Sequence, residues 1–273
     1  MIIAQISDTH IDLDCPDTDG RLRDFEQTIA DINALDPQPD IIVHTGDIVH
    51  NGRKDEYGAA REILSTARAP VYVMAGNKDN RENLHEAFAA GGYLAPEPDI
   101  IDYRIEDFPV RLIMLDTKMS GSNKGDFCVE RADRLIDMID AETTLPIAVF
   151  MHHPPYVVNE GPHEHHFDTK DMAVRLRQAI HHSNRVVAVF TGHVHRAVSG
   201  DVAGIPGSSM ASIATSLRKG DYPDGMKSRP VYQLHRFESD GSFTTETRIV
   251  RSELKKPAPH MEAPLQSQAL SRP

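Results

Sequence analysis

The amino-acid sequence predicts an α/β fold with a small antiparallel addition near its C-terminal end. Three patterns along the 273 residues lead to this prediction. Short apolar runs rich in β-branched residues recur, segments with helical periodicity separate them, and a hairpin pattern follows beyond about residue 200. Alternating strands and helices are typical of α/β architecture.

The expected strands are apolar along their whole length, which is typical of strands buried inside a domain. They comprise residues 2–6, 40–45, 70–75, 111–115, 146–151 and 185–191.

Between these strands, apolar residues recur at spacings of three and four, which predicts amphipathic helices. One face consists of Leu22, Phe25, Ile29 and Ile32, a second of Tyr57, Ala60, Ile63, Leu64 and Ala67, and a third of Ala132, Leu135, Ile136 and Ile139.

The sequence pattern of the C-terminal region differs from that of the rest of the chain. Gly/Ser/Pro-rich connections follow residue 200, and then residues 231–237 and 243–250 form a hairpin pattern around Ser239-Asp240-Gly241. We expect this hairpin to add antiparallel strands at a sheet edge. Because the stretch from about Lys255 has several prolines and no periodicity, we predict one domain over residues 1–254 and a flexible tail over 255–273.

The composition and the net charge disfavour two classes of partner. Twenty-nine Lys and Arg stand against 41 Asp and Glu, a formal net charge of −12, which disfavours nucleic acid polymers and anionic membranes. Cys15 and Cys128 are far apart, so no disulfide framework is expected. With no transmembrane window and no signal-peptide pattern, we expect a cytoplasmic protein.

Residue types that bind metals follow the C-terminal ends of five expected strands. They are Asp8 and His10, Asp47, Asn77, His152 with His153, and His193 with His195. Binding sites of open α/β sheets form at the carboxyl ends of the strands. We therefore expect these distant side chains to converge.

The local spacing adds two expectations. In Asp8-x-His10 and His193-x-His195 an extended backbone would point both side chains of the pair the same way. Three candidates also follow a glycine that permits a tight backbone turn, and these glycines are Gly46, Gly76 and Gly192.

The candidates form a mixed donor set of two carboxylates, one amide oxygen and four imidazoles, which suits Mn, Fe, Zn or Co. Seven ligands exceed the needs of one tetrahedral ion, but they divide evenly between two ions if Asp47 bridges. One ion then takes Asp8, His10, Asp47 and His195, and the other takes Asp47, Asn77, His152 and His193. Two ions ~3.5–4 Å apart can generate a hydroxide and clamp phosphate oxygens, which predicts hydrolysis of a phosphate ester.

The same motifs resemble a known family. Asp8-x-His10, Gly46-Asp47, Gly76-Asn77, His152-His153-Pro154-Pro155 and Gly192-His193-x-His195 look like the calcineurin-like metallophosphoesterase signature, over about residues 1–200. Residues 7–10, 46–57, 115–127 and 151–155 are similar, more narrowly, to class III cyclic-nucleotide phosphodiesterases and bacterial glycerophosphodiesterases. The resemblance implies a two-sheet αββα sandwich, the ligand division given above and a diester substrate.

One position departs from the family pattern. The chain has Gly76-Asn77-Lys78-Asp79 where the family usually has His after the Asn. The usual candidate acid or phosphate-binding His is therefore absent. Lys78 is a candidate to act as a point charge on the phosphate or as the proton donor to the leaving group, and the alternative is a solvated loop residue without a role.

Other side chains are candidate substrate contacts. Asn51 lies in the loop after Gly46-Asp47, and His153 is the second His of its pair, for which a structural role is the alternative. The His-rich segment 163–168 is expected to be a solvated loop, although it offers a substitute for the missing His.

We therefore expect a binuclear phosphodiesterase that cleaves a small diester, such as a cyclic nucleotide or a glycerophosphodiester, by attack of a metal-bound hydroxide. Asn77 would help neutralise the developing charge, and Lys78 or water would protonate the leaving alcohol. The alternatives are a phosphomonoesterase on the same two metals and a non-catalytic scaffold. Residues 48–52 lack the arginine usual in the protein phosphatase loop, and the acidic charge disfavours a nuclease. The resemblance is compatible with a homo-oligomer.

Overall fold

Two β-sheets face each other in the middle of the computed structural model, which describes residues 1–96, 99–141, 144–158 and 166–251. The first sheet consists of β1 (Ile2–Ile6), β2 (Ile41–His44), β3 (Val71–Val73), β10 (Val231–Phe237) and β11 (Phe243–Ile249). Its order is β11-β10-β1-β2-β3. β1, β2 and β3 are parallel, whereas β10 is antiparallel to both β1 and β11.

The second sheet contributes the other half of the sandwich. It consists of β4 (Tyr103–Ile105), β5 (Arg111–Leu115), β6 (Ile147–Met151), β7 (Val186–Thr191), β8 (Val198–Val202) and β9 (Ile205–Ser209). The order is β4-β5-β6-β7-β9-β8, and the four central strands β5, β6, β7 and β9 are parallel to one another. The edge strands β4 and β8 run antiparallel to β5 and β9.

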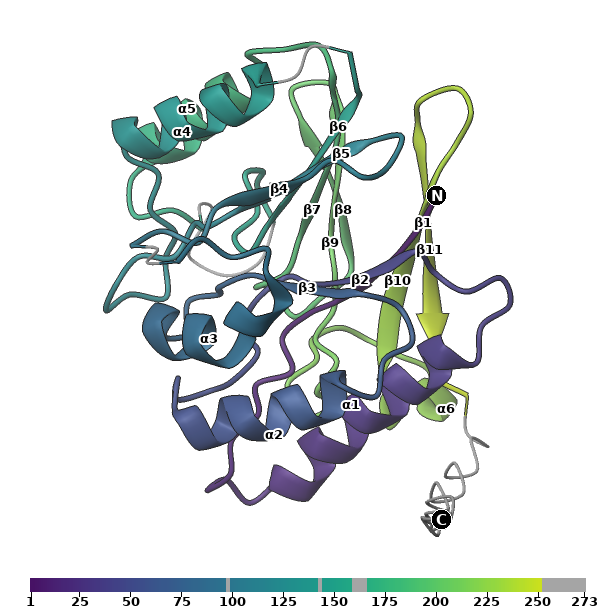
Figure 1. The fold of residues 1–273 in the computed structure, drawn as a ribbon. Helices are drawn as coiled ribbons and strands as arrows, with labels where there is room; N and C mark the ends of the chain where they lie inside the picture. The colour runs from purple at the N-terminus through teal and green to yellow at the C-terminus, as the bar shows by residue number, and fades with distance from the viewer. Residues whose placement is uncertain (97–98, 142–143, 159–165, 252–273) are drawn as a thin grey trace, which may run out of the picture.

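Helices cover the outer faces of the two sheets, as Figure 1 shows, with α1 and α2 on the side of the first sheet and α4 and α5 on the side of the second. The helices are α1 (Thr18–Asn33), α2 (Lys54–Leu64), α3 (Arg81–Phe88), α4 (Val129–Asp140), α5 (Lys170–Ile180) and the short α6 (Asp224–Lys227), with a 3₁₀ turn η1 (Ala89–Gly91) after α3. The predicted αββα sandwich is confirmed.

The expected elements form close to their predicted bounds. All six predicted strands and the C-terminal hairpin are present, and β5 and β6 are buried along their whole length, as their apolar sequences indicate. In α1, Phe25, Ile29 and Ile32 are fully buried. Helix α2 ends at Leu64, so Ala67 lies beyond it, although Ala67 still packs against the core.

The stretch after residue 197 differs from the prediction. Residues 198–209 were expected to be connections, but they form the β8–β9 hairpin, and β9 pairs in parallel with β7. Glycine, serine and proline have low strand propensity, yet ladder hydrogen bonds to a buried neighbour decide the conformation here. The amino-acid composition of residues 198–209 therefore does not predict this hairpin.

Polar side chains cross the interior between the sheets. Gln5 of β1 donates through Nε2 to Thr45 Oγ1 at 3.0 Å and to the carbonyl of Thr191 in β7 at 3.0 Å. His235 of β10 contacts Gln5 Oε1 at 2.9 Å through Nε2. These bonds fix the first sheet against the second directly beneath the loops that follow β1, β2 and β7.

At its C-terminal end the structure describes the chain as far as residue 251. The predicted tail, residues 255–273, lies outside the described residues, so the domain boundary at 254 stays a prediction. Of the helices within the described ranges, none has the length and apolar character needed to cross a bilayer.

Candidate metal centre

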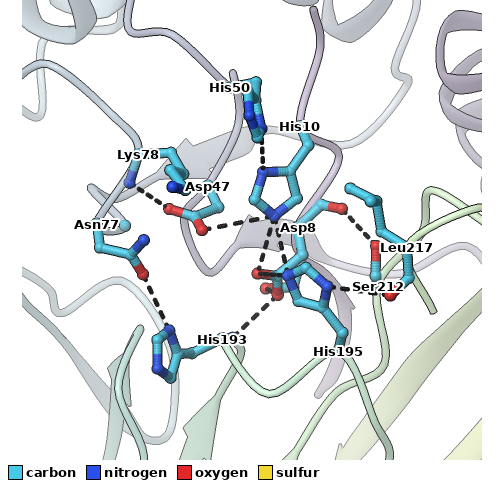
Figure 2. Close-up of polar contacts among 12 residues, drawn as sticks. Asp8, His10, Asp47, His50, Asn77, Lys78, His193, His195, Ser212 and Leu217 are labelled. Carbon is cyan, nitrogen blue, oxygen red and sulfur yellow. Dashed lines mark hydrogen bonds and ion pairs between the residues drawn. The ribbon is translucent and has the colours of Figure 1, made fainter. Parts of the chain in front are cut away.

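The loops at the C-terminal ends of β1, β2 and β3 meet those of β6 and β7 at one end of the sandwich. Figure 2 shows side chains from these loops pointing toward one another. All seven predicted donors lie here: Asp8, His10, Asp47, Asn77, His152, His193 and His195. The predicted convergence is confirmed.

The backbone reaches this arrangement through left-handed conformations. The φ angles are 55° at Asp8, 46° at His10, 50° at Asp47, 71° at His193 and 58° at His195. The prediction of an extended backbone in the two D-x-H and H-x-H motifs is therefore wrong. Each such conformation costs about 1–2 kcal/mol for a residue with a Cβ, and such strain tends to cluster at functional sites.

Hydrogen bonds between the loops hold these conformations. The amide of Asp8 donates to the carbonyl of Gly46 at 3.0 Å, and the amide of His10 donates to the carbonyl of Asp47 at 3.0 Å. The amide of His193 donates to Asp8 Oδ2 at 3.0 Å. The loops after β1, β2 and β7 therefore restrain one another.

The three glycines act in two ways. Gly46 has φ of 93°, which provides the expected turn. Gly76 and Gly192 do not have positive φ; instead, a Cβ at Gly76 would collide with the amide of Asp47, and one at Gly192 would lie 2.8 Å from Asp8 Oδ2. At those two positions glycine permits close approach of the loops rather than a turn.

The first donor group consists of Asp8, His10, Asp47 and His195, whose ligand atoms all lie within 4.8 Å of one another. The Nε2 atoms of His10 and His195 are 2.9 Å apart, and His195 Nε2 lies 3.3 Å from Asp8 Oδ1. Asp8 Oδ1 is buried and has no hydrogen-bond partner among the described residues. An unpaired buried carboxylate oxygen facing two imidazole nitrogens fits a cation.

The second donor group surrounds Asn77. Its Oδ1 atom lies 3.0 Å from His152 Nε2 and 2.9 Å from His193 Nδ1. Asp47 stands between the groups, because its Oδ2 atom is 3.5 Å from His152 Nε2 and also 3.5 Å from His10 Nε2. This position is the one that a bridging carboxylate requires.

The tautomers of two histidines follow from their partners. His195 Nδ1 contacts the carbonyl of Leu217 at 3.1 Å, and His152 Nδ1 contacts the carbonyl of Thr45 at 2.8 Å. A carbonyl only accepts, so both Nδ1 atoms carry hydrogen. In the neutral rings Nε2 then presents a lone pair to the centre, as metal-ligating histidines do.

Charges within the centre shift the pKa values of its members. Burial raises the pKa of Asp8, but His195 and His10 outweigh it and hold the value well below the usual range. Burial likewise raises the pKa of Asp47, and His152 and His10 lower it further than burial raises it. Burial lowers the pKa of His152, but Asp47 raises it to about 9. The centre thus stabilises positive charge beside Asp8 and Asp47, which metal ions can supply in place of protons.

The candidate substrate contacts occupy different surroundings. The amide of Lys78 donates to Asp47 Oδ1 at 2.7 Å, and Figure 2 shows Lys78 beside Asp47. The side chain of Asn51 donates to Glu56 Oε1 at 2.7 Å and to Asp12 Oδ1 at 3.1 Å, so it is engaged at the start of α2. Binding of substrate by Lys78 or Asn51 stays a prediction.

His153 lies beside the second donor group. Its ligand atom lies within 4.8 Å of those of His152 and His193, and its ring centroid is 4.5 Å from that of His193. Its Nδ1 atom is 2.8 Å from Thr117 Oγ1. The side chain is fully buried, which is consistent with the structural alternative. From the His-rich segment, His166 lies with its ring centroid 5.2 Å from that of His193, whereas residues 163–165 lie outside the described part.

The sequence motifs did not single out several neighbours of the centre. His50 Nδ1 lies 3.4 Å from His10 Nδ1, Lys118 Nζ donates to the carbonyl of Asn77 at 2.7 Å, and Ser212 Oγ donates to the carbonyl of Asp8 at 2.7 Å. His50 and Lys118 fall inside the quoted segments 46–57 and 115–127, which could have marked them. Ser212 had no signal, because it lies in a Gly/Ser-rich stretch without periodicity.

A comparison with models of protein families shows the family to which this chain belongs. The model of the calcineurin-like phosphoesterase family matches residues 1–197, which include all seven predicted donors. This chain belongs to the calcineurin-like phosphoesterase family. The motif-based prediction of a metal-dependent phosphoric ester hydrolase is thereby confirmed.

Two curated relatives of this chain are phosphodiesterases by name. A probable glycerophosphodiester phosphodiesterase GpdQ of Arcobacter nitrofigilis is 30% identical over 265 residues, which cover 92% of this chain and 93% of that protein. The 3′,5′-cyclic adenosine monophosphate phosphodiesterase CpdA of Pseudomonas aeruginosa is 26% identical over 161 residues, or 57% of this chain and 56% of that protein. The narrower resemblance to these two phosphodiesterase groups is confirmed.

A solved structure shares the fold. A dimetal phosphatase from Danio rerio superposes with a TM-score of 0.69 at 14% identity, over 92% of this chain and 99% of that one. At this identity the likeness concerns the fold alone.

Proposed function

We propose that this calcineurin-like phosphoesterase is a binuclear phosphodiesterase that hydrolyses a small diester, either a cyclic nucleotide or a glycerophosphodiester. The observation that carries the proposal is the position of Asp47, whose Oδ2 atom lies 3.5 Å from a histidine of each donor group. Two complete donor groups that share one carboxylate suit two metal ions. The phosphodiesterase names of both relatives support a diester over a monoester.

We assign the first metal ion to Asp8, His10, Asp47 and His195, and the second to Asp47, Asn77, His152 and His193. Nitrogen and oxygen donors without thiolates suit Mn, Fe, Zn or Co. When bound, two such ions activate water at neutral pH and neutralise the charge that develops on the phosphate oxygens.

The chain itself supplies orientation around the reacting phosphate. Asn77 directs its carbonyl oxygen to His152 and His193, while its Nδ2 atom donates to Asn123 Oδ1 at 3.3 Å. Because the two ends of the amide have different partners, its orientation is fixed. Lys78, next in the chain, is then assigned to the phosphate or to the leaving alcohol, in the role of the histidine usual in the family.

Two rival functions make different predictions. A phosphomonoesterase would use the same donor groups but prefer a substrate with a terminal phosphate. A scaffold would have no need of either donor group, and both are complete among the described residues. A cytoplasmic location and a homo-oligomer stay predictions.

The test compares bis(p-nitrophenyl) phosphate with p-nitrophenyl phosphate on Mn-reconstituted protein. We expect faster turnover of the diester, and Asn77→Ala should abolish it if the activity belongs to this chain. Faster turnover of the monoester would replace the proposal with the phosphatase. Inactivity on both substrates would favour the scaffold.

A second panel distinguishes the two diester classes. Cyclic AMP, cyclic GMP and glycerophosphodiesters are compared by kcat/KM on the same preparation. The class with the higher value identifies the substrate class of the chain, and the variant Asn77→Ala again serves as the control for contaminating activity.

A further inference from the structure

The segment 210–217 lies beyond the residues that match the family and runs along the first donor group. Ser212 Oγ donates to the carbonyl of Asp8 at 2.7 Å, and the amide of Ile213 donates to the carbonyl of Ser7 at 3.1 Å. The carbonyl of Leu217 accepts from His195 Nδ1 at 3.1 Å. Figure 2 shows Ser212 and Leu217 on the side of Asp8 and His195. One segment thus contacts two of the four donors of the first group.

The segment is itself fastened to helix α1. Asp24 Oδ2 accepts from the amide of Thr215 at 2.9 Å and from Thr215 Oγ1 at 2.7 Å. Asp24 is only 4% exposed. A buried carboxylate is costly unless it is hydrogen-bonded, so the pair with Thr215 holds both groups in one arrangement.

The same helix reaches another donor. Arg21 precedes Asp24 by three residues and therefore lies on the same face of α1. Its Nη1 atom donates to the carbonyl of His10 at 2.8 Å. Helix α1 thus contacts His10 directly and contacts Asp8 and His195 through the segment 210–217.

We propose that Asp24 is a positioning residue of the metal centre, which acts through Thr215 and the segment 210–217 on Asp8 and His195. The inference rests on the proposed function because it assumes that these residues bind metal. Asp8 and His195 have φ of 55° and 58°, conformations that persist only where surrounding contacts enforce them. The segment provides such contacts at the carbonyl of Asp8 and at the ring of His195.

Asp31 provides a matched control on the same helix. Its buried carboxylate accepts from Tyr232 Oη at 2.7 Å and from Arg251 Nε at 2.7 Å, so it fastens α1 to the C-terminal part of the chain. These contacts involve neither the segment 210–217 nor a predicted metal donor. Asp24→Ala and Asp31→Ala thus each remove a buried, hydrogen-bonded carboxylate from α1, and only the first is expected to affect the metal centre.

The experiment is calorimetric titration of metal-free protein with Mn²⁺, with the unfolding temperature measured on the same samples. We expect wild type to bind two ions and Asp24→Ala to bind one of them about 10–100-fold more weakly, the range typical of outer-shell partners. Thr215→Val should weaken the same ion, and Thr215→Ser should restore it because it keeps the hydroxyl. Asp31→Ala should lower the unfolding temperature and leave both affinities unchanged.

The outcomes separate this inference from the proposed function. Wild-type affinities in Asp24→Ala and Thr215→Val, with two ions bound, would overturn the positioning role alone. Equal weakening by Asp31→Ala would also overturn it, because any loosening of α1 would then suffice. If Asp24→Ala does not fold, Thr215→Val and its serine counterpart decide. Failure of wild type to bind Mn²⁺ would overturn both the inference and the metal assignment.

Discussion

At the scale of single residues, the candidate centre depends on buried oxygen and nitrogen atoms that the loops bring close together. Asp8 Oδ1 is the clearest case, since it is buried and lacks a hydrogen bond within the described ranges, with His195 Nε2 3.3 Å away. Such a group destabilises the fold when nothing compensates it. A cation at this place would remove the penalty, so metal binding should stabilise the folded chain.

The shared carboxylate gives the first prediction. The variant Asp47→Asn should either lose one metal ion completely or bind both ions more weakly. Diester hydrolysis should fall by more than about 100-fold, because loss of a metal ligand should have a larger effect than loss of an outer-shell partner. Metal content of the dialysed protein and kcat/KM check this. Asp107→Asn, which removes an exposed carboxylate, serves as the charge-matched control. A variant Asp47→Asn that retains both ions would refute the ligand assignment.

Lys78 gives the second prediction. If it protonates the leaving group, Lys78→Ala should slow diesters of weakly acidic alcohols by about 10²–10⁴-fold and leave p-nitrophenyl esters nearly unchanged. Lys78→His, which restores the usual family motif, should recover much of the loss. The measurement is kcat across aryl diesters of graded phenol acidity.

Lys54→Ala is the control for Lys78, because Lys54 is an exposed lysine on α2 that pairs with Glu86. An equal loss of kcat for every leaving group in Lys78→Ala would contradict proton donation and indicate a point charge on the phosphate.

At the scale of elements, a buried carboxyl group connects the loops that carry Asp47 and Asn77. Asp79 accepts from the amides of Gly76 at 2.8 Å and of Ile48 and Val49 at 3.3 Å each. Tyr57 of α2 donates to the same group through Oη at 2.9 Å. Helix α2 therefore braces both loops through one side chain.

The third prediction concerns this brace. Tyr57→Phe removes the hydrogen bond to Asp79 and also the one that the Tyr57 hydroxyl accepts from the amide of Asn80 at 2.9 Å, so the free energy of unfolding should fall by about 1–3 kcal/mol. Chemical denaturation of metal-free protein measures the change. Tyr72→Phe is the matched control, because no hydrogen bond of the Tyr72 hydroxyl is seen to any described residue, and it should change stability by less than about 0.5 kcal/mol. Equal effects of the two variants would rule out a specific role of the Tyr57 hydroxyl.

A second cluster supports Asn77 from the other sheet. Asp116 at the end of β5 binds Arg81 through two hydrogen bonds of 2.5 and 2.9 Å. Arg81 and Arg131 also donate to the carbonyl of Lys118, at 2.6 and 3.0 Å. Since Lys118 Nζ donates to the carbonyl of Asn77, this ion-pair network restrains the backbone of a predicted ligand.

At the scale of the whole molecule, the two sheets must keep one relative position, because each contributes part of the donor set. The buried contacts among His235, Gln5 and Thr191 join them below the centre. Burial lowers the pKa of His235 to about 3, so this imidazole is neutral in the folded protein at ordinary pH.

The fourth prediction follows from that shift. In the unfolded chain His235 takes up a proton below its ordinary pKa of about 6.5, whereas the folded chain does not. The unfolded state therefore binds more protons, and stability falls as pH falls below about 6.5. At pH 5.5 the contribution of His235 is a loss of about 1.4 kcal/mol relative to neutral pH.

In addition to Gln5, His235 contacts Thr245, whose Oγ1 atom lies 2.8 Å from its Nδ1 atom. Comparison with His235→Gln isolates the contribution of titration, because an amide side chain can hydrogen-bond these partners but does not titrate. The free energy of unfolding is measured for both proteins at pH 7.5 and 5.5. Wild type should lose about 1.4 kcal/mol more than the variant over this interval. Equal losses would mean that His235 is not held neutral by the fold.

The sequence by itself predicted six strands, the C-terminal hairpin, three of the helices and the side chains that converge at the candidate centre. Apolar runs such as residues 111–115 indicate buried strands, and chemical type limits a metal ligand to a few kinds of side chain. Because ligands follow strand ends, their order along the chain also predicted that Asp8 and His195 would meet.

Only the tertiary structure decided how they meet. Left-handed φ at Asp8 and His195 is unfavourable for any isolated segment and exists because neighbouring loops supply hydrogen bonds across nearly 200 residues of sequence. The β8–β9 hairpin and the contact of Asp24 with Thr215 likewise have no local signal. The hairpin and this contact are stabilised by pairing with groups that are distant in the sequence. A pattern of neighbouring residues does not contain that information.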